Sequence, residues 1–418
     1  MNRYIISGGK SINGSIKCQG SKNAVLPILT ASILNQSKSK ISNCPKLRDV
    51  DIMIKILKRL GCKVEVENDE ITLDSSTFDH FEIDQSLMRE MRSSIIFMGP
   101  MLAKANQVII SYPGGCDIGQ RPIDMHISGL SKLGAKIEEE RGFIRCTADR
   151  LQGADIYLDF PSVGATENIM CAAVLAKGDT YIRNAAREPE IIDLENFLVA
   201  MGAKVSGAGT NVIKIKGVSE LHEVEYRAMP DRIVAGTYLA AAAITSGSIL
   251  IDDIRYGHME SFLSKFREMG CKVVRKNGSI ILEAPNKLKT ITHIRTAPYP
   301  GFPTDMQQIF MSLLAVSSGT AMVVETIFEN RFRQVNELMR MGAYIKVDGR
   351  VAVVNGVDRL YGTTVTASDL RGGASLIIAG LVAEGETIVE DEKHVERGYM
   401  NIEGDLTKIG AQITKESI

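Results

Sequence analysis

The cysteine at position 116 has an unusual setting for a thiol, within the stretch YPGGCDIGQRPIDMH at residues 112–126. The glycines on both sides favour an exposed loop, and Arg121 could stabilise a thiolate. Such a thiol could act as a nucleophile or as a general acid, although most cysteines of cytosolic enzymes are inert core residues. His126 suggests a Cys–His pair, but a ten-residue separation on a loop leaves the geometry of that pair open.

Basic residues recur in motifs that each occur once in the chain. GSKNAVLPIL places Lys22 and Asn23 at the start of an expected helix, where free backbone N–H groups and the helix dipole favour an anion. Four more motifs, MRSSI, FENRF, SDLRGG and HVERGY, contain Arg92, Arg331, Arg371 and Arg397, and MRSSI places Arg92 within an expected apolar helix. Each alone is compatible with a helix cap or a surface ion pair. Together they predict a ligand with more than one anionic group, because a guanidinium binds carboxylate and phosphate through paired hydrogen bonds.

Acidic residues and a polar turn complete the candidate set. Asp305 follows the proline-rich turn YPGFPT, and Asp369 lies in SDLRGG. FPSVGATEN, residues 160–168, is a Ser/Gly-rich turn that enters an expected helix and suits a phosphate or a base edge, although such turns also occur without ligands. The fingerprints GxxxxGK[ST] and GxGxxG are both missing, which argues against P-loop and dinucleotide sites. A phosphorylated small molecule is therefore the predicted substrate.

The charge of the chain is balanced, with 49 basic and 50 acidic residues and a net charge of −1. No global field points to nucleic acid or to an anionic membrane surface as the partner. The start of the chain has no sustained apolar segment, and the later run VAGTYLAAAAITSG is too short and interrupted to cross a bilayer. We therefore expect a cytoplasmic protein without membrane insertion. Seven scattered cysteines form neither a disulfide framework nor a CxxC metal pair.

The elements that must position these residues follow a repeat. An apolar residue, a glycine and a small residue precede a β-prone run six times, with the glycines at 61, 134, 202, 270, 342 and 410. A helical pattern precedes each glycine, for example Ile191, Leu194 and Leu198, so the glycine is expected to cap a helix. Four repeats show a second, alanine-rich helix upstream, closed by its own glycine, as in AAAITSGSILIDD. Each repeat is therefore predicted to be a β-α-β-α-β-β unit.

Six such units are too bulky for one core, so we expect an α/β protein with two domains of three units, helices inward. The first domain would span residues 21–229, and the second would combine residues 1–20 with 230–418. The chain would cross between them near Met229 and Pro230. A cleft between two similar domains is a natural place for a ligand.

Seven strings in order along the whole chain, GSKNAVLPIL, PGGCDIGQRPIDMH, PSVGATEN, AREPEIID, FPTDMQ, FENRF and SDLRGGAS, resemble those of the UDP-N-acetylglucosamine 1-carboxyvinyltransferases, a family of enolpyruvyl transferases. The resemblance implies an inside-out α/β barrel of the EPSP synthase type, with a catalytic cysteine loop at 112–121 and an active site in the interdomain cleft. It implies transfer of the enolpyruvyl group of phosphoenolpyruvate to the 3′-hydroxyl of UDP-N-acetylglucosamine, the first committed step of peptidoglycan synthesis. No metal or other cofactor is implied.

The resemblance also implies roles for individual residues. Cys116 would be the general acid toward C3 of phosphoenolpyruvate and the target of the epoxide inhibitor fosfomycin, and Asp305 would be the base for the sugar hydroxyl. Lys22 and Arg397 would also be catalytic. Phosphoenolpyruvate would be bound by Lys22, Asn23, Arg92, Arg121, Arg331, Asp369, Arg371 and Arg397. The nucleotide sugar would be bound by Asn23, Arg92, Arg121, Pro122, Asp124, Met125, Ser162, Val163, Gly164, Asp305 and Ile327. Phe160 stands where some relatives have a lysine near the nucleotide.

Three other functions are compatible with parts of the sequence. A 5-enolpyruvylshikimate-3-phosphate synthase would share the six-unit fold but lacks the cysteine loop. A non-catalytic paralogue that senses a sugar nucleotide would not need both an acid at Cys116 and a base at Asp305. A cysteine hydrolase would need an orienting group for His126, and the sequence identifies none.

Overall fold

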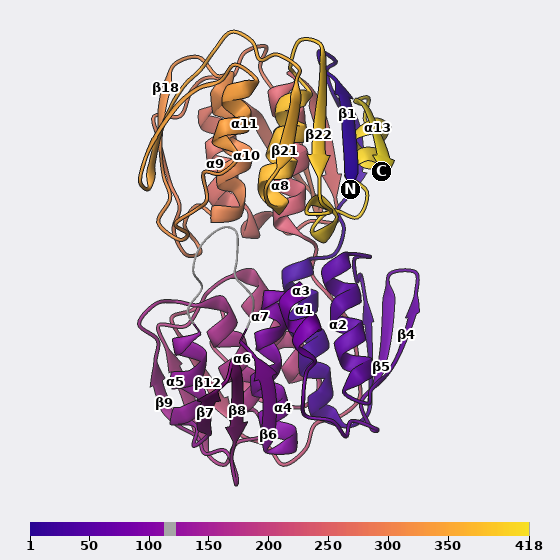
Figure 1. Ribbon diagram of the computed structural model, residues 1–418, viewed down its shortest axis with the longest axis vertical. Helices are drawn as coiled ribbons and strands as arrows, with labels where there is room; N and C mark the ends of the chain where they lie inside the picture. The colour runs from indigo at the N-terminus through magenta and orange to yellow at the C-terminus, as the bar shows by residue number, and fades with distance from the viewer. Residues whose placement is uncertain (113–122, 418) are drawn as a thin grey trace. The chain divides into compact units, whose positions relative to one another are not determined.

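The computed structural model describes residues 1–112 and 123–417, which divide into two units. The first unit contains residues 20–112 and 123–229, and the second contains residues 1–19 and 230–417. Each unit has its own hydrophobic core. The two are described separately below, and Figure 1 labels many of their elements.

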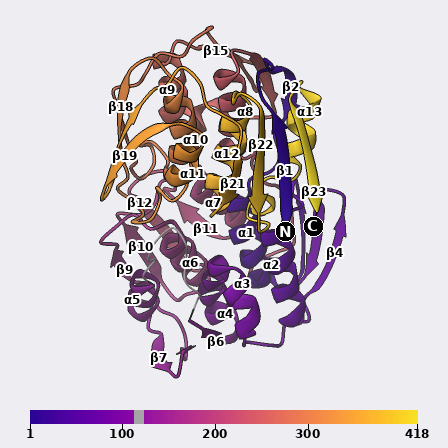
Figure 2. The same ribbon diagram turned by 45° about the horizontal axis from the view of Figure 1, so that its top comes forward.

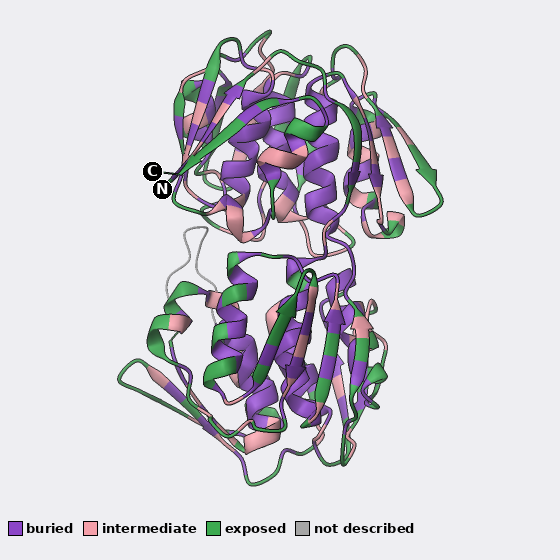
Figure 3. Ribbon diagram, turned by 90° about the vertical axis from the view of Figure 1, so that its right-hand side faces the viewer, coloured by how far each residue is buried: buried purple, intermediate pink, exposed green. Residues whose placement is uncertain are grey.

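Three helices form the centre of the second unit: α8 (Arg232–Ile244), α10 (Thr304–Ala315) and α12 (Leu370–Gly380). Every residue of α8 is buried, and α10 packs against both α8 and α12. A helix that is apolar around its whole circumference must be covered on all sides. Figure 3 shows these helices almost entirely in the colour of buried residues, with exposed residues on the surrounding strands. The expectation of inward-facing helices is confirmed for this unit.

Three four-stranded sheets surround these helices, in the orders β17-β18-β20-β19, β15-β16-β14-β2 and β21-β22-β1-β23. Their strands from the body of the unit are β14 (Ser248–Asp252), β15 (Lys272–Lys276), β16 (Ser279–Glu283), β17 (His293–Arg295), β18 (Thr320–Val324), β19 (Tyr344–Asp348), β20 (Val351–Asn355), β21 (Thr364–Ala367), β22 (Glu386–Asp391) and β23 (Gln412–Ser417). The outer helices are α9 (Glu260–Glu268), α11 (Val335–Arg340) and α13 (Ile402–Lys408). Single turns of 3₁₀ helix are η3 (Tyr256–His258) and η4 (Val395–Arg397).

The start of the chain completes two of these sheets. Strand β1 (Asn2–Ser7) runs antiparallel between β22 and β23, as Figure 2 shows. Strand β2 (Asn13–Lys17) pairs in parallel with β14. The second unit therefore closes only with residues from the opposite end of the sequence.

The first unit repeats the same plan around the helices α1 (Lys22–Ala31), α4 (Met98–Ala105) and α6 (Val163–Ala173). Its other helical elements are η1 (Ser32–Asn35), α2 (Arg48–Arg59), α3 (Gln85–Glu90), η2 (Arg92–Phe97), α5 (Asp124–Lys132) and α7 (Pro189–Ala200). Its strands are β3 (Lys38–Ser42), β4 (Lys63–Glu67), β5 (Glu70–Asp74), β6 (Gln107–Ser111), β7 (Lys136–Glu140), β8 (Phe143–Thr147), β9 (Asp155–Tyr157), β10 (Asp179–Arg183), β11 (Lys204–Ser206), β12 (Val212–Lys216) and β13 (Val224–Arg227).

Two sheets of the first unit have four strands, β13-β3-β5-β4 and β11-β12-β10-β9, and the third has the order β6-β8-β7. Beside β6, a single parallel bridge from Glu82 to Ile109 stands where the other sheets have a fourth strand. Strand β13, from the last repeat of the unit, pairs in parallel with β3 of its first repeat. This pairing closes the ring of sheets around the helices.

The six repeat glycines all have left-handed backbones, with φ between +92° and +105°. Glycine adopts this conformation without the steric cost of a Cβ, which is why it ends the outer helices. Two details differ from the sequence prediction. At the end of α8 the left-handed residue is Ser246, whereas Gly247 allows close approach, since a Cβ there would lie 1.9 Å from the Ile12 carbonyl oxygen. Arg92 begins a 3₁₀ helix rather than lying within an apolar α-helix.

No helix within residues 1–112 and 123–417 has the length and the apolar composition that a bilayer crossing requires.

Candidate active site

Asp305 is held between two arginines of the second unit. It is the second residue of α10, and its side chain is 27% exposed. Nη2 of Arg331 donates to Oδ1 at 2.7 Å, while Nε and Nη2 of Arg371 donate to Oδ2 at 3.2 and 3.1 Å. Both arginine side chains are only 3% exposed. The arrangement stabilises an ionised carboxylate and leaves these three groups with a net positive charge, which suits an anionic ligand.

Arg331 has a further donor available. Its Nε is buried and has no hydrogen-bond partner among the described residues. Its guanidinium also lies over the ring of Phe328, with 5.6 Å between Cζ and the ring centroid. A buried donor without an acceptor is costly unless a ligand or water meets it. This N–H is therefore a candidate contact for an anion.

Asp369 serves the backbone of the helix that carries Arg371. Its Oδ1 accepts hydrogen bonds from the backbone N–H groups of Arg371 and Gly372, both at 3.0 Å, so it caps α12. Its Oδ2 accepts from Nε2 of Gln308, also at 3.0 Å. The carboxylate thereby fixes the start of α12 relative to α10, which positions Arg371 for its contact with Asp305.

Lys22 is the first residue of α1 in the first unit, and its ammonium is buried against an acid. Nζ donates to Oδ2 of Asp49 at 3.0 Å, and Asp49 lies in the first turn of α2. Asn23, the next residue, is exposed. The helix start at Ser21 has no side-chain cap, so its free N–H groups remain available to a ligand as the sequence pattern suggests.

His126 lies in α5 and is buried beside the start of α6. Nδ2 of Asn168 lies 2.7 Å from His126 Nδ1, and the Oδ1 of the same amide accepts from Gly99 N at 2.7 Å. Burial, with a smaller contribution from the positive charge of Arg92, lowers the pKa of His126 to about 4. The ring is therefore neutral at pH 7, with Nδ1 as acceptor and the proton on Nε2.

The predicted turn FPSVGATEN does begin a helix. Ser162 is the N-cap of α6, and its Oγ accepts from the backbone N–H of Ala165 at 3.4 Å. Val163 and Gly164 form the first turn and are partly exposed. At Gly164 a Cβ would lie 3.2 Å from Cε1 of His126, so a larger residue would crowd that ring.

The remaining predicted site residues are spread over both units. Asp124 is exposed at the start of α5, and Met125 packs partly on the core. In the second unit, Ile327 is partly exposed after β18, and Arg397 is partly exposed at the end of η4. Phe160 is 42% exposed. Three predicted residues lie outside the described part of the chain: Cys116, Arg121 and Pro122.

The sequence reasoning missed Glu325, a carboxylate that is 1% exposed. Its Oε1 accepts from Thr296 Oγ1 at 2.9 Å and from the backbone N–H groups of Ile327 and Phe328 at 2.8 and 3.2 Å. Its Oε2 accepts from Thr304 Oγ1 at 2.9 Å. Glu325 thus ties the segment of Ile327 to the helix start that carries Asp305. A lone acid directly after the apolar run MVV was the available signal.

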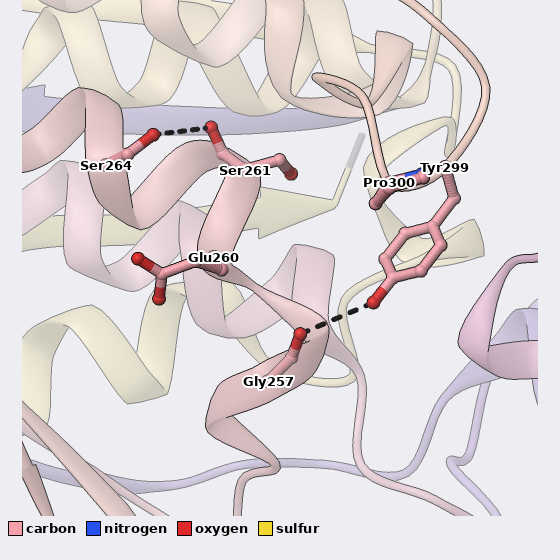
Figure 4. Close-up of a pocket in the computed structure, with 6 residues that line it drawn as sticks. All are labelled: Gly257, Glu260, Ser261, Ser264, Tyr299 and Pro300. Atoms are coloured by element: carbon pink, nitrogen blue, oxygen red, sulfur yellow. Dashed lines mark hydrogen bonds between the residues drawn. The ribbon is translucent and has the colours of Figure 1, made fainter.

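A hollow of about 290 Å³ opens elsewhere on the second unit. Figure 4 shows its lining from η3, α9 and the turn before α10, formed by Gly257, Glu260, Ser261, Ser264, Tyr299 and Pro300. Oη of Tyr299 donates to the carbonyl of Gly257 at 3.3 Å. None of the predicted site residues within residues 1–112 and 123–417 is among the residues that line this hollow.

The six cysteines within the described ranges are buried: Cys18, Cys44, Cys62, Cys146, Cys171 and Cys271. Burial raises the pKa of each of these thiols, and raises it to about 12 for Cys44, Cys62, Cys146 and Cys271. They are protonated and shielded at neutral pH.

Within residues 1–112 and 123–417, no three His, Cys, Asp or Glu side chains are grouped so that they could hold a metal ion.

Solved structures share this architecture. The enolpyruvyl transferase NikO from Streptomyces tendae superposes with a TM-score of 0.89 at 23% identity, covering 99% of this chain and 98% of its own. EPSP synthase from Acinetobacter baumannii superposes with a TM-score of 0.77 at 18% identity, covering all of both chains. The fold is therefore that of the enolpyruvyl transferases, which confirms the predicted fold class.

Sequence comparison identifies the family. The family model of EPSP synthase (3-phosphoshikimate 1-carboxyvinyltransferase) matches residues 6–406, and the chain belongs to this family. A UDP-N-acetylglucosamine 1-carboxyvinyltransferase of Caldanaerobacter subterraneus subsp. tengcongensis is 53% identical over 415 residues, covering 99% of this chain and 100% of that protein. Another, from Symbiobacterium thermophilum, is 51% identical over 419 residues, covering 99% and 95%.

Proposed function

We propose that the protein transfers the enolpyruvyl group of phosphoenolpyruvate to the 3′-hydroxyl of UDP-N-acetylglucosamine and releases inorganic phosphate. The observation that carries this proposal is the 53% identity to a UDP-N-acetylglucosamine 1-carboxyvinyltransferase over the whole of that relative. The reaction is the first committed step of peptidoglycan synthesis and takes place in the cytoplasm.

The chemistry is an addition followed by an elimination. The 3′-oxygen forms a bond to C2 of phosphoenolpyruvate while C3 gains a proton, which gives a tetrahedral ketal. The C2–O bond to phosphate then breaks and C3 loses a proton, which restores the double bond. The protein must therefore remove a proton from the sugar hydroxyl, supply one to C3 in the addition, accept one from C3 in the elimination and stabilise the departing phosphate.

The base is Asp305, since an ionised carboxylate held by Arg331 and Arg371 can accept the hydroxyl proton from a fixed position. The acid toward C3 is Cys116. The phosphate and carboxylate of phosphoenolpyruvate are bound by Lys22, Asn23, Arg92, Arg121, Arg371 and Arg397, with Arg331 and Asp369 as supporting groups that position them. The nucleotide sugar contacts Asn23, Arg92, Arg121, Pro122, Asp124, Met125, Ser162, Val163, Gly164, Asp305 and Ile327.

The decisive assay measures phosphate release from phosphoenolpyruvate with each of two acceptors, UDP-N-acetylglucosamine and shikimate 3-phosphate. We expect phosphate release when UDP-N-acetylglucosamine is the acceptor and none when shikimate 3-phosphate is the acceptor. In Cys116→Ala, the release with UDP-N-acetylglucosamine should be lost. Cys271→Ala is the matched control, because it removes a buried thiol of the second unit and should retain activity. Release with shikimate 3-phosphate instead would make the protein a 5-enolpyruvylshikimate-3-phosphate synthase. Binding of the nucleotide sugar without release would indicate a sensing paralogue.

Fosfomycin provides a covalent test of the cysteine. One adduct is expected, on Cys116, since the other six thiols are buried and their pKa values are raised. Intact-mass analysis counts the adducts, and peptide mapping locates them. An adduct on any other cysteine would contradict the assignment of Cys116 as the reactive thiol.

A further inference from the structure

Two buried hydroxyl groups connect helix α8 to Arg371 in the second unit. Nη1 of Arg371 donates to the Tyr399 hydroxyl at 3.1 Å, and that hydroxyl lies 2.8 Å from Oγ1 of Thr237. Thr237 Oγ1 in turn donates to the carbonyl of Ile233 at 2.9 Å. The Arg371 guanidinium also lies over the Tyr399 ring, 5.4 Å from its centroid. Tyr399 is 2% exposed and Thr237 is fully buried.

The number of hydroxyl protons decides which group donates and which accepts in each of these hydrogen bonds. Thr237 has a single hydroxyl proton and donates it to the Ile233 carbonyl. The hydroxyl of Tyr399 must therefore donate to Thr237, which leaves an oxygen lone pair to accept from Arg371. Burial raises the pKa of Tyr399, so its proton stays in place at neutral pH. Each polar group in this hydrogen-bond network therefore has a partner, as buried polar networks require.

We propose that Tyr399 and Thr237 are positioning residues for the transfer reaction, which they serve by fixing the guanidinium of Arg371 and thereby Oδ2 of Asp305. This inference rests on the proposed function, in which Asp305 is the base. The guanidinium has Nε and Nη2 on Oδ2 and Nη1 on Tyr399, so contacts on two sides set its plane. Arg331 contacts only Oδ1 and cannot replace that restraint.

The variant Tyr399→Phe removes the hydroxyl and keeps the ring. We expect kcat for phosphate release to fall about tenfold or more, because small misplacement of a catalytic group is costly. Thr237→Val should lower kcat in the same direction, and Thr237→Ser, which keeps a hydroxyl, should restore it. The double variant Tyr399→Phe with Thr237→Val should be no slower than Tyr399→Phe alone, since both changes interrupt the same series of hydrogen bonds.

Tyr238→Phe is the matched control. Tyr238 is the residue after Thr237 and is equally buried, but its hydroxyl donates to Asp405 Oδ2 at 2.6 Å and takes no part in the chain. Tyr238→Phe should leave kcat unchanged. Equal losses in Tyr399→Phe and Tyr238→Phe, or no rescue by Thr237→Ser, would overturn the proposal.

A second measurement separates this inference from the proposed function. Hydrogen exchange at Nε–H of Arg371, followed by NMR and assigned by its loss in Arg371→Lys, should accelerate about tenfold in Tyr399→Phe and not in Tyr238→Phe. Unchanged exchange in Tyr399→Phe would overturn the positioning of Arg371, whatever the activity. If exchange accelerates in Tyr399→Phe but the wild-type protein releases no phosphate from phosphoenolpyruvate, the positioning of Arg371 stands and the proposed function is rejected, together with the role of these hydrogen bonds in that reaction.

Discussion

Nζ of Lys22 lies 3.0 Å from Oδ2 of Asp49, where the two side chains are only 11% and 2% exposed. The contact joins the first turn of α1 to the first turn of α2. A buried ammonium needs a compensating charge, because removal from water disfavours the ionised form. The charge of Lys22, which the proposed mechanism uses toward phosphoenolpyruvate, is therefore supported by Asp49.

Replacing Asp49 tests this pair. Asp49→Asn should lower the free energy of unfolding by about 3–5 kcal/mol, because it leaves a buried charge without its partner. Urea titration followed by circular dichroism measures the change. Asp155→Asn is the control, since Asp155 and Arg183 form an ion pair with side chains 56% and 47% exposed, and its loss should leave the free energy of unfolding nearly unchanged. Similar losses in both variants would mean that burial does not distinguish the pairs.

His126 should make stability depend on pH in the acidic range. Its pKa in the folded protein is about 4, below the ordinary 6.5, so the unfolded chain binds this proton first as pH falls. Neutral His126 therefore makes its full contribution to the free energy of unfolding above pH 6.5. This contribution is lost as pH falls toward 4, and the difference between the two pKa values corresponds to about 3 kcal/mol. Urea unfolding at several pH values should show the decline in wild type and a smaller one in His126→Asn. The control His293→Asn alters an exposed histidine. If it weakened the acid-induced decline in stability as much as His126→Asn does, the assignment of that decline to His126 would be refuted.

Glu167 should make stability depend on pH in the opposite direction. Burial raises its pKa well above the ordinary value, with a smaller effect from the charges of Glu190 and Glu188. A raised pKa gives stability that is complete at low pH and is lost as pH rises through the folded-state value. Glu167→Gln should therefore gain stability relative to wild type as the pH is raised, measured by thermal unfolding. The control Glu138→Gln, at an exposed position on β7, should show no such trend. A difference in stability between Glu167→Gln and wild type that stays constant with pH would contradict the prediction.

Glu325 allows a test of the segment that carries Ile327. Glu325→Ala removes four accepted hydrogen bonds and should raise KM for UDP-N-acetylglucosamine about tenfold, because it frees both Ile327 and the start of α10. Glu325→Gln should remain near wild type, since its amide oxygen can replace Oε1 and its amide nitrogen can donate to Thr304. Steady-state kinetics compare the two variants. An unchanged KM in Glu325→Ala would remove Glu325 from the group of positioning residues.

The repeat made most of the fold predictable. The outer helices end at Gly61, Gly134, Gly202, Gly270, Gly342 and Gly410 because only glycine takes the left-handed conformation there without strain, and this leaves a mark in the sequence. The alanine-rich, largely apolar run of α8 likewise indicates a central helix. The pairing of β1 with β22 and β23 has no such mark, since a short strand can pair with any free sheet edge.

Sequence alone determined which residues could do chemistry: Lys22, Cys116, Asp305 and the arginines stand out because they are polar and break the repeat. Only the tertiary structure decided which partners Lys22 and Asp305 have. Asp49 and Glu325 lie 27 and 20 residues from Lys22 and Asp305 and resemble surface acids when read one by one. Burial gives them their importance, because a charge removed from water must be paired, and neither burial nor pairing is a property of a single residue.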